Sequence, residues 1–153
     1  VWEKAVAAVV EEEVTEFQVD VANVLDRLLS ANFMLIKFRA ESVSSADVLG
    51  ENPSGTLKFL SGSTNNTMLN ALPFLPRRVD YHSETAELYL LRQNWNGFVN
   101  WQRRIHPRNQ NYMDAWNQNV PMGVSQGNPT QKFVITASNT AIGAGSCFEI
   151  YVA

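Results

Sequence analysis

The sequence predicts a mainly β protein, an antiparallel β-sandwich or jelly roll with an N-terminal helical arm. Three observations support this fold class. Before about residue 30, the apolar residues follow helical spacing. From residue 33 onward they alternate with polar residues in short runs, which is typical of strands that bury one face. No helical pattern separates these runs, and this argues against a βαβ architecture. We therefore expect a helical arm over residues 1–30 and a β-sandwich domain over residues 31–153.

The predicted arm contains two helical segments around a short extended piece. The first segment carries apolar residues at i, i+4, i+7 and i+8, namely Trp2, Val6, Val9 and Val10. The acidic run at 11–13 opposes the dipole of a helix C-terminus, so the first helix is expected to end there. An extended piece containing Phe17 and Val19 leads to a helix over residues 20–30, with Asp20 as its N-cap. A short isolated helix is unstable in water. We therefore expect the first helix to lie against a neighbouring subunit and to be dispensable for folding of the β domain.

Five strands are expected in the β domain. The clearest covers residues 33–41, where one face carries Met34, Ile36, Phe38 and Ala40. The other four cover residues 56–60, 85–92, 131–138 and 146–152. Residues 67–72 are interpreted as one helical turn, and residues 94–127 as a long polar and aromatic loop. The last two strands are expected to form a pair joined by residues 139–145, which contain Gly143 and Gly145.

Charge is distributed unevenly along the chain. Residues 1–30 contain seven acidic and two basic side chains, whereas the rest of the chain contains eight acidic and ten basic ones. The net charge of the whole chain is only −3, so no strongly charged partner is indicated for the molecule as a whole.

Several features bear on how the chain is made. No apolar stretch is long enough to span a membrane, and no secretory signal is recognisable. The chain starts at Val1 and ends on a strand-like run, which suggests a product cut from a precursor or an ordered fragment of a longer chain. Its single cysteine, Cys147, cannot form an internal disulfide, and this fits a reducing compartment.

The segment 92–116 is the main candidate for a binding surface. It combines arginines with aromatic residues, and we single out Arg103, Arg104, Arg108, Trp95, Trp101 and Trp116. Guanidinium groups can neutralise phosphates and aromatic faces can stack on bases, which would suit single-stranded nucleic acid. Indole faces beside Asn and Gln could instead hold a sugar. We favour a third interpretation, in which the aromatic residues are buried under a loop or in a subunit contact, since protein interfaces are also rich in aromatic residues and arginine.

No enzymatic site is expected. Asp80, His82 and Ser83 are triad residue types, but Ser83 points away from the other two in an extended strand and lacks a nucleophile-elbow motif. His82 and His106 have no further ligand types at metal-binding spacing. Catalytic residues, a metal site and a cofactor are therefore not predicted.

Three stretches resemble the capsid proteins of picorna-like viruses. Residues 23–36, N-V-L-D-R-L-L-S-A-N-F-M-L-I, look like the helical lead-in to the first strand of such proteins. Residues 73–91, P-F-L-P-R-R-V-D-Y-H-S-E-T-A-E-L-Y-L-L, resemble their passage from a small helix into a long core strand. Residues 132–153, K-F-V-I-T-A-S-N-T-A-I-G-A-G-S-C-F-E-I-Y-V-A, are similar to their last strand pair. The resemblance implies an eight-stranded jelly roll, released from a polyprotein by a protease and assembled into an icosahedral shell around RNA.

The expected function is therefore that of a structural capsid protein. Its partners would be copies of itself or sister subunits, with genomic RNA on the inner face and a host receptor as further candidates. It would reside in the virion after assembly in the host cytoplasm. An arm that contacts RNA is usually basic, so the acidic arm is expected to contact neighbouring subunits. The alternative is a trimeric jelly-roll or lectin-like module that recognises a carbohydrate or a receptor.

Overall fold

The computed structural model describes residues 1–41, 54–72, 83–94, 97–106, 112–116, 120–125, 127–138 and 141–153. The fold is mainly β, with one short helix among these residues. Its elements, in chain order, are β1 (Glu3–Val9), β2 (Glu16–Asp20), the 3₁₀ turn η1 (Ala22–Val24), α1 (Leu25–Ser30), β3 (Phe33–Glu41), β4 (Ser54–Ser61), β5 (Thr64–Leu72), β6 (Ser83–Asn94), β7 (Gly97–His106), β8 (Tyr112–Trp116), β9 (Val120–Pro121), β10 (Gln131–Ser138) and β11 (Cys147–Val152).

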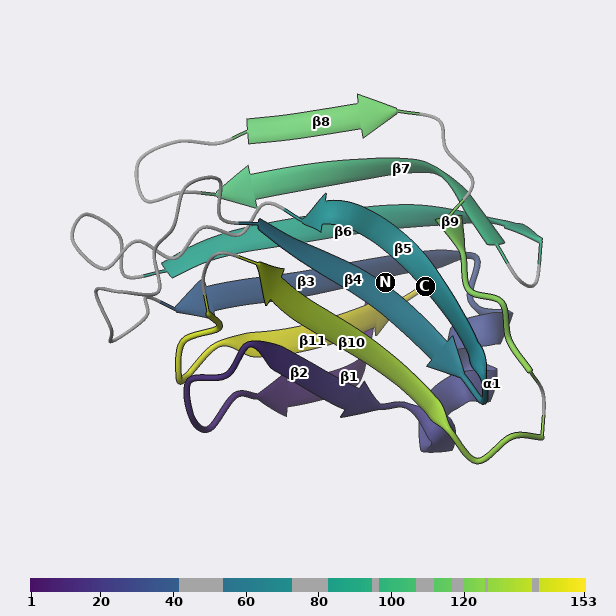
Figure 1. The fold of residues 1–153 in the computed structure, drawn as a ribbon. Helices are drawn as coiled ribbons and strands as arrows, with labels where there is room; N and C mark the ends of the chain where they lie inside the picture. The colour runs from purple at the N-terminus through teal and green to yellow at the C-terminus, as the bar shows by residue number, and fades with distance from the viewer. Residues whose placement is uncertain are drawn as a thin grey trace.

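The described strands form two antiparallel sheets (Figure 1). The larger sheet has the order β1-β11-β3-β6-β7-β8, with β9 also paired to β7, and the smaller sheet has the order β2-β10-β4-β5. Four of the pairings are nested in the sequence: β1 with β11, β2 with β10, β3 with β6, and β4 with β5. This is the pattern of one long hairpin that has been folded over. Two further pairings, β11 with β3 and β10 with β4, join the nested pairs within each sheet. The pairings of β6 with β7, of β7 with β8 and of β7 with β9 complete the larger sheet.

The β4–β5 turn lies at the centre of this nest. Ser61 pairs with Thr64, which leaves Gly62 and Ser63 as a two-residue hairpin loop. Gly62 has φ +62°, a conformation that hairpin loops of this length require and that glycine adopts at little cost. The turn chemistry and the strand pairing therefore favour the same local structure.

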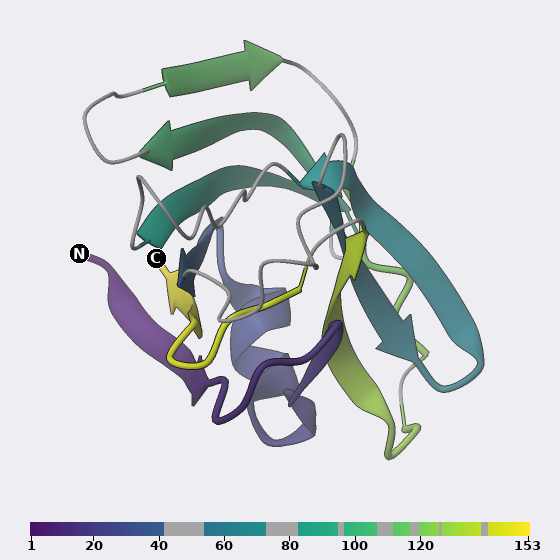
Figure 2. The same cartoon turned by 60° about the vertical axis from the view of Figure 1, so that its left-hand side comes forward.

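The two sheets, seen as separate layers in Figure 2, share one hydrophobic core. Its largest side chains are four fully buried phenylalanines, Phe38, Phe59, Phe133 and Phe148. The ring centroids of Phe59 and Phe133 are 4.9 Å apart, and those of Phe133 and Phe148 are 5.8 Å apart. Since Phe133 belongs to the smaller sheet and Phe148 to the larger one, these tilted contacts join the two layers.

The clearest strand prediction is confirmed. Met34, Ile36, Phe38 and Ala40 are all buried on one face of β3, with exposed fractions between 0% and 3%. The predicted strands at 56–60, 85–92, 131–138 and 146–152 correspond to β4, β6, β10 and β11.

The helix predicted for the start of the chain is wrong, because residues 3–9 form strand β1. Spacings of four and eight residues fit both a helix and a strand, since they preserve the face in either structure. The predicted helix would place Val9 and Val10 on the same buried face. In the structure Val9 is 61% exposed and Val10 is 2% exposed, as expected where successive residues of an extended chain face opposite sides. The open side of β11 supplies the hydrogen-bonding partner that fixes the strand. The N-terminal segment is therefore not a helical arm: β1 and β2 contribute one strand to each sheet.

The second predicted helix is present in shortened form, as η1 followed by α1. The prediction of Asp20 as the N-cap is wrong, because Asp20 ends β2 and the N-cap of η1 is Val21, which makes no side-chain cap hydrogen bond. Asp20 Oδ1 instead accepts a hydrogen bond of 2.9 Å from the backbone N–H of Ala22, within the turn that leads into η1. Leu28 and Leu29 of α1 are buried in the common core.

Three other predictions need correction. Residues 67–72 belong to strand β5 instead of a helical turn, because their pairing with β4 places Met68 in the core. The predicted loop at 94–127 contains β7, β8 and β9, in keeping with the strand preference of its aromatic and β-branched residues. Finally, β10 and β11 do not pair with each other. They lie in different sheets, each between two other strands.

Candidate subunit interface

The structure places four of the six candidate contact residues at one end of the larger sheet. Trp101, Arg103 and Arg104 lie in β7, and Trp116 lies in β8. Trp95 and Arg108 lie outside the described residues. Chain topology thus brings most of the predicted set onto two adjacent strands.

The register of β7 gives these residues defined neighbours. Trp101 is directly opposite Trp116, and Arg103 is directly opposite Asp114. Arg104 is opposite Glu87 on the other side, in β6. The contact of these arginines with nucleic acid or with a subunit stays a prediction.

Strands β7 and β8 extend the larger sheet beyond the smaller one. Figures 1 and 2 both show β8 as the outermost strand, on the side away from β1 and β2. β9 connects this extension to the rest of the fold, because Asn66 Nδ2 of β5 donates a hydrogen bond of 3.1 Å to the carbonyl oxygen of Met122. Met122 itself is fully buried. The extension is therefore attached to the body of the fold by the pairing of β7 with β6 and by this hydrogen bond beside β9.

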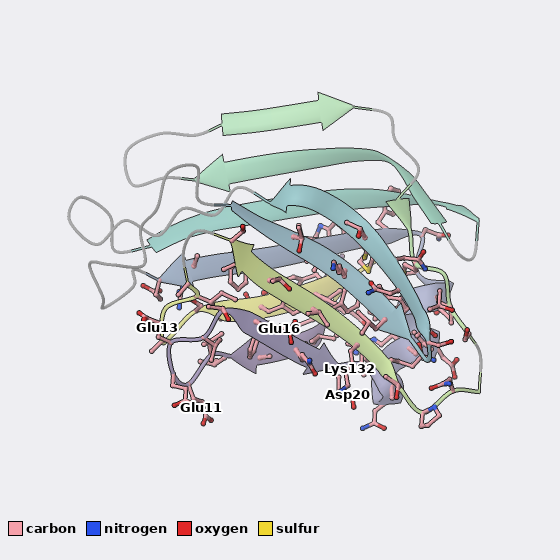
Figure 3. The ribbon with its side chains drawn as sticks, viewed as in Figure 1. Glu11, Glu13, Glu16, Asp20 and Lys132 are labelled. Carbon is pink, nitrogen blue, oxygen red and sulfur yellow. The ribbon has the colours of Figure 1, made fainter. Side chains whose placement is uncertain are left out.

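The opposite end of the molecule carries most of the acidic side chains described. Glu11 and Glu12 are exposed at the bend between β1 and β2, and Glu16 and Asp20 are exposed on β2 (Figure 3). On the neighbouring strand, Lys132 donates a hydrogen bond of 3.2 Å to Gln18 Oε1. Among the described residues, no group of three or more His, Cys, Asp or Glu side chains is arranged to hold a metal ion.

A small polar cluster lies where β1 and β11 pair. Lys4 Nζ is 2.8 Å from Glu149 Oε2, and the hydroxyl of Tyr151 donates a hydrogen bond of 3.2 Å to the same oxygen. The ammonium group of Lys4 also lies 5.7 Å from the centre of the Tyr151 ring. The hydrogen bond from Lys4 lowers the pKa of Glu149, and the same contact raises the pKa of Lys4. The cluster therefore ties the N-terminal strand to the C-terminal strand.

Replacing Lys4 by Met should lower the thermal midpoint slightly at neutral pH. Because the pKa of Glu149 is lowered in the folded state, its contribution to stability is present above the pKa of an unfolded Glu, about 4.3, and is lost as the pH falls through the folded value. The difference between wild type and variant should therefore shrink below about pH 4. Thermal unfolding followed by circular dichroism from pH 3 to pH 8 checks this. A difference that is constant over this range would contradict the assigned contact.

A hollow of about 340 Å³ lies beside the two chain ends. Its polar lining includes Glu3, Arg27, Ser30 and Asn32, and Arg27 Nη2 is 2.7 Å from Glu3 Oε2. Both partners of this ion pair are well exposed, so water screens their attraction. The contact connects α1 to β1 without creating a charged recognition site.

Of the three residues considered for catalysis, only Ser83 lies among the described residues. Ser83 begins β6, while Asp80 and His82 lie outside the described residues. His106 ends β7, and Cys147 is half-buried with a free thiol. Sequence reasoning missed the Lys4–Glu149 contact entirely. These residues are 145 positions apart, and no local pattern signals the pairing.

Comparisons with known proteins add no family assignment. No protein-family model matches the chain, and no curated protein matches it either. None of the helices among the described residues has the length and apolar character needed to cross a membrane.

Proposed function

We propose that the protein is a structural capsid subunit that assembles with copies of itself or with sister subunits into an icosahedral shell around RNA. The observation that carries the proposal is the strand order. When β7, β8 and β9 are left out, the strand orders of the two sheets are β1-β11-β3-β6 and β2-β10-β4-β5. Eight strands split in this way, with nested pairing, match a β-sandwich of the jelly-roll kind, which is common in viral capsid and lectin domains.

The extension formed by β7 and β8 supports an assembly role. It is inserted between the sixth and seventh of these eight strands, β6 and β10, so it enlarges one sheet without disturbing the pairing of the others. An exposed sheet edge offers unpaired backbone groups to another chain. In this proposal, the two-sheet body is a rigid unit, and its edges and loops contact neighbouring subunits.

A trimeric, lectin-like binding module is the second candidate. The observation that favours it is the register of Trp101 and Trp116, which lie at directly opposed positions of β7 and β8. Tryptophan is a residue type suited to contact a sugar ring, and lectin domains also use the jelly-roll architecture. Under this proposal, the extension would carry the ligand site, and assembly would stop at a small oligomer.

Sedimentation velocity of the purified chain, combined with a glycan array, separates the two candidates. The capsid proposal predicts a fast-sedimenting species far larger than a trimer, and no specific glycan. The binding-module proposal predicts a discrete trimer that binds a defined sugar and loses that binding in Trp101→Ala. A chain that remains monomeric at high concentration and binds no glycan would contradict both.

A further inference from the structure

Strand β1 has an open edge that lacks the usual protection. It lies at the end of the larger sheet and pairs only with β11 in the part of the chain that is described. From Ala5 to Val9 it contains no charged residue and no proline, and Val9 is 61% exposed. Proteins normally protect such edges with charges, prolines, bulges or short strands. The protective features that β1 does have, the charged residues Glu3 and Lys4 and a bulge between Lys4 and Val6, all lie at one end of the strand.

The neighbouring edge of the smaller sheet is protected. β2 has five residues, and its outward positions carry Glu16, Gln18 and Asp20. Both edges lie on the same side of the molecule (Figure 1). An approaching chain would therefore find unpaired backbone groups on β1 and negative charge beside them.

The hydrogen bonds next to β1 identify which backbone groups are free. The N–H of Val10 donates to Ser146 O at 2.7 Å, and the carbonyl oxygen of Val10 accepts from Gly145 N at 2.8 Å. Adjacent residues of an antiparallel strand direct their N–H and C=O groups to opposite sides. The backbone groups of Ala8, two residues before Val10, therefore also point to β11. Ala7 and Val9 must then direct their N–H and C=O groups away from β11, to the open edge.

A symmetric pairing of β1 with β1 of a second copy is disfavoured by charge. Such a pairing would bring the two β2 strands together as well, since β1 and β2 form the same side of the molecule. The carboxylates of Glu16 and Asp20 in one copy would then lie close to those of the second copy's β2. Like charges brought together in this way repel each other.

The other edge of the larger sheet is a better partner. β8 is unpaired on its outer side among the described strands. The described strands at that end, β7 and β8, contain two arginines, Arg103 and Arg104, and a single acidic residue, Asp114. The first thirty residues contain seven acidic side chains and two basic ones. The β1 end of the sheet is therefore rich in acidic residues and the β7–β8 end is not, a difference in charge that favours head-to-tail contact.

We propose that β1 of one copy pairs edge to edge with β8 of a second copy, so that the larger sheet continues from subunit to subunit. This inference rests on the proposed assembly function and specifies its contact. A head-to-tail contact uses two different surfaces, and it produces a closed ring when the rotation between subunits closes. The backbone groups of Ala7 and Val9 give the strand-to-strand bonds, and the acidic residues beside them orient the partner.

The decisive variant is Ala7→Pro. Proline removes the N–H of Ala7, which points to the open edge, and leaves the bonds between β1 and β11 in place. Ala7→Thr is the matched control, because it keeps the N–H at the same exposed position. We expect Ala7→Pro to remain folded by circular dichroism and to lose the fast-sedimenting species at concentrations where wild type and Ala7→Thr assemble.

A second variant keeps the test valid if the proline disturbs folding. Combining Glu12→Lys with Glu16→Lys reverses charge at two exposed positions beside β1 and should reduce the assembled fraction more at low salt than at high salt. Normal assembly of a folded Ala7→Pro variant, or unchanged assembly of the double variant at low salt, would overturn the edge contact while leaving the proposed function in place. A wild-type chain that never assembles would overturn both.

Discussion

Deleting residues 1–19 should abolish cooperative folding. The deletion removes all of β1 and most of β2, and therefore the outermost strand from one end of each sheet. It also removes Val10 and Val19 from the core, where they are 2% and 6% exposed. Burial of each such side chain contributes about 1.5–3 kcal/mol, and the free energy of unfolding of a domain is only about 5–15 kcal/mol. The newly exposed edges of β10 and β11 would in addition favour aggregation.

Circular dichroism and thermal unfolding of the truncated chain measure this effect directly. Deleting only Val1 and Trp2 is the control, since both precede β1 and their side chains are exposed. The control should keep a cooperative transition close to that of the wild type. A truncated chain that starts at residue 20 and still unfolds cooperatively would show that the first two strands are dispensable, as the sequence alone had suggested.

Replacing Phe133 by Ala should lower the free energy of unfolding by about 3–5 kcal/mol. Phe133 is fully buried, and its ring contacts those of Phe59 in its own sheet and Phe148 in the other sheet. Truncation leaves a cavity at the junction of the two layers, which the surrounding strands cannot fill without shifting. The loss is a large fraction of the total stability of an ordinary domain.

Urea denaturation provides the measurement, with Phe33→Ala as the matched control. Phe33 is the same residue type at the start of β3, but it is 47% exposed. The control should cost much less, and both variants should keep the m-value of the wild type if the unfolded state is unchanged. Equal losses at the two positions would contradict the common core described for the two sheets.

Strands with one buried face could be predicted from the sequence because their signal is local. In β3 the apolar residues alternate without interruption, and the observed bounds agree with the prediction. β1 could not be predicted in the same way, since its apolar spacing suits a helix equally well and the decision depends on β11, which lies almost the whole chain away. The partners of β10 and β11 were also unpredictable. Sequence proximity suggested a hairpin, whereas the nested pairing places them in different sheets.

The candidate site shows the same division between local and non-local information. Composition identified the segment that contains Trp101 and Arg103 as unusual, and the structure places these two residues in β7, next to the edge strand β8. The opposition of Arg103 to Asp114 follows from the register of β7 and β8, which the expectation of a loop did not include. The open edge of β1 could not be predicted for a similar reason, because the helix expected at the start of the chain has no unpaired strand edge.

Electron microscopy of the purified full chain, under the conditions in which it sediments fastest, is the most direct test of the assembly proposal. The account predicts closed particles of uniform diameter, and copurifying RNA inside them that withstands nuclease. It also predicts that these particles are absent from preparations of folded Ala7→Pro. A field of single small molecules or discrete trimers at every concentration, with no closed particles, would contradict the account.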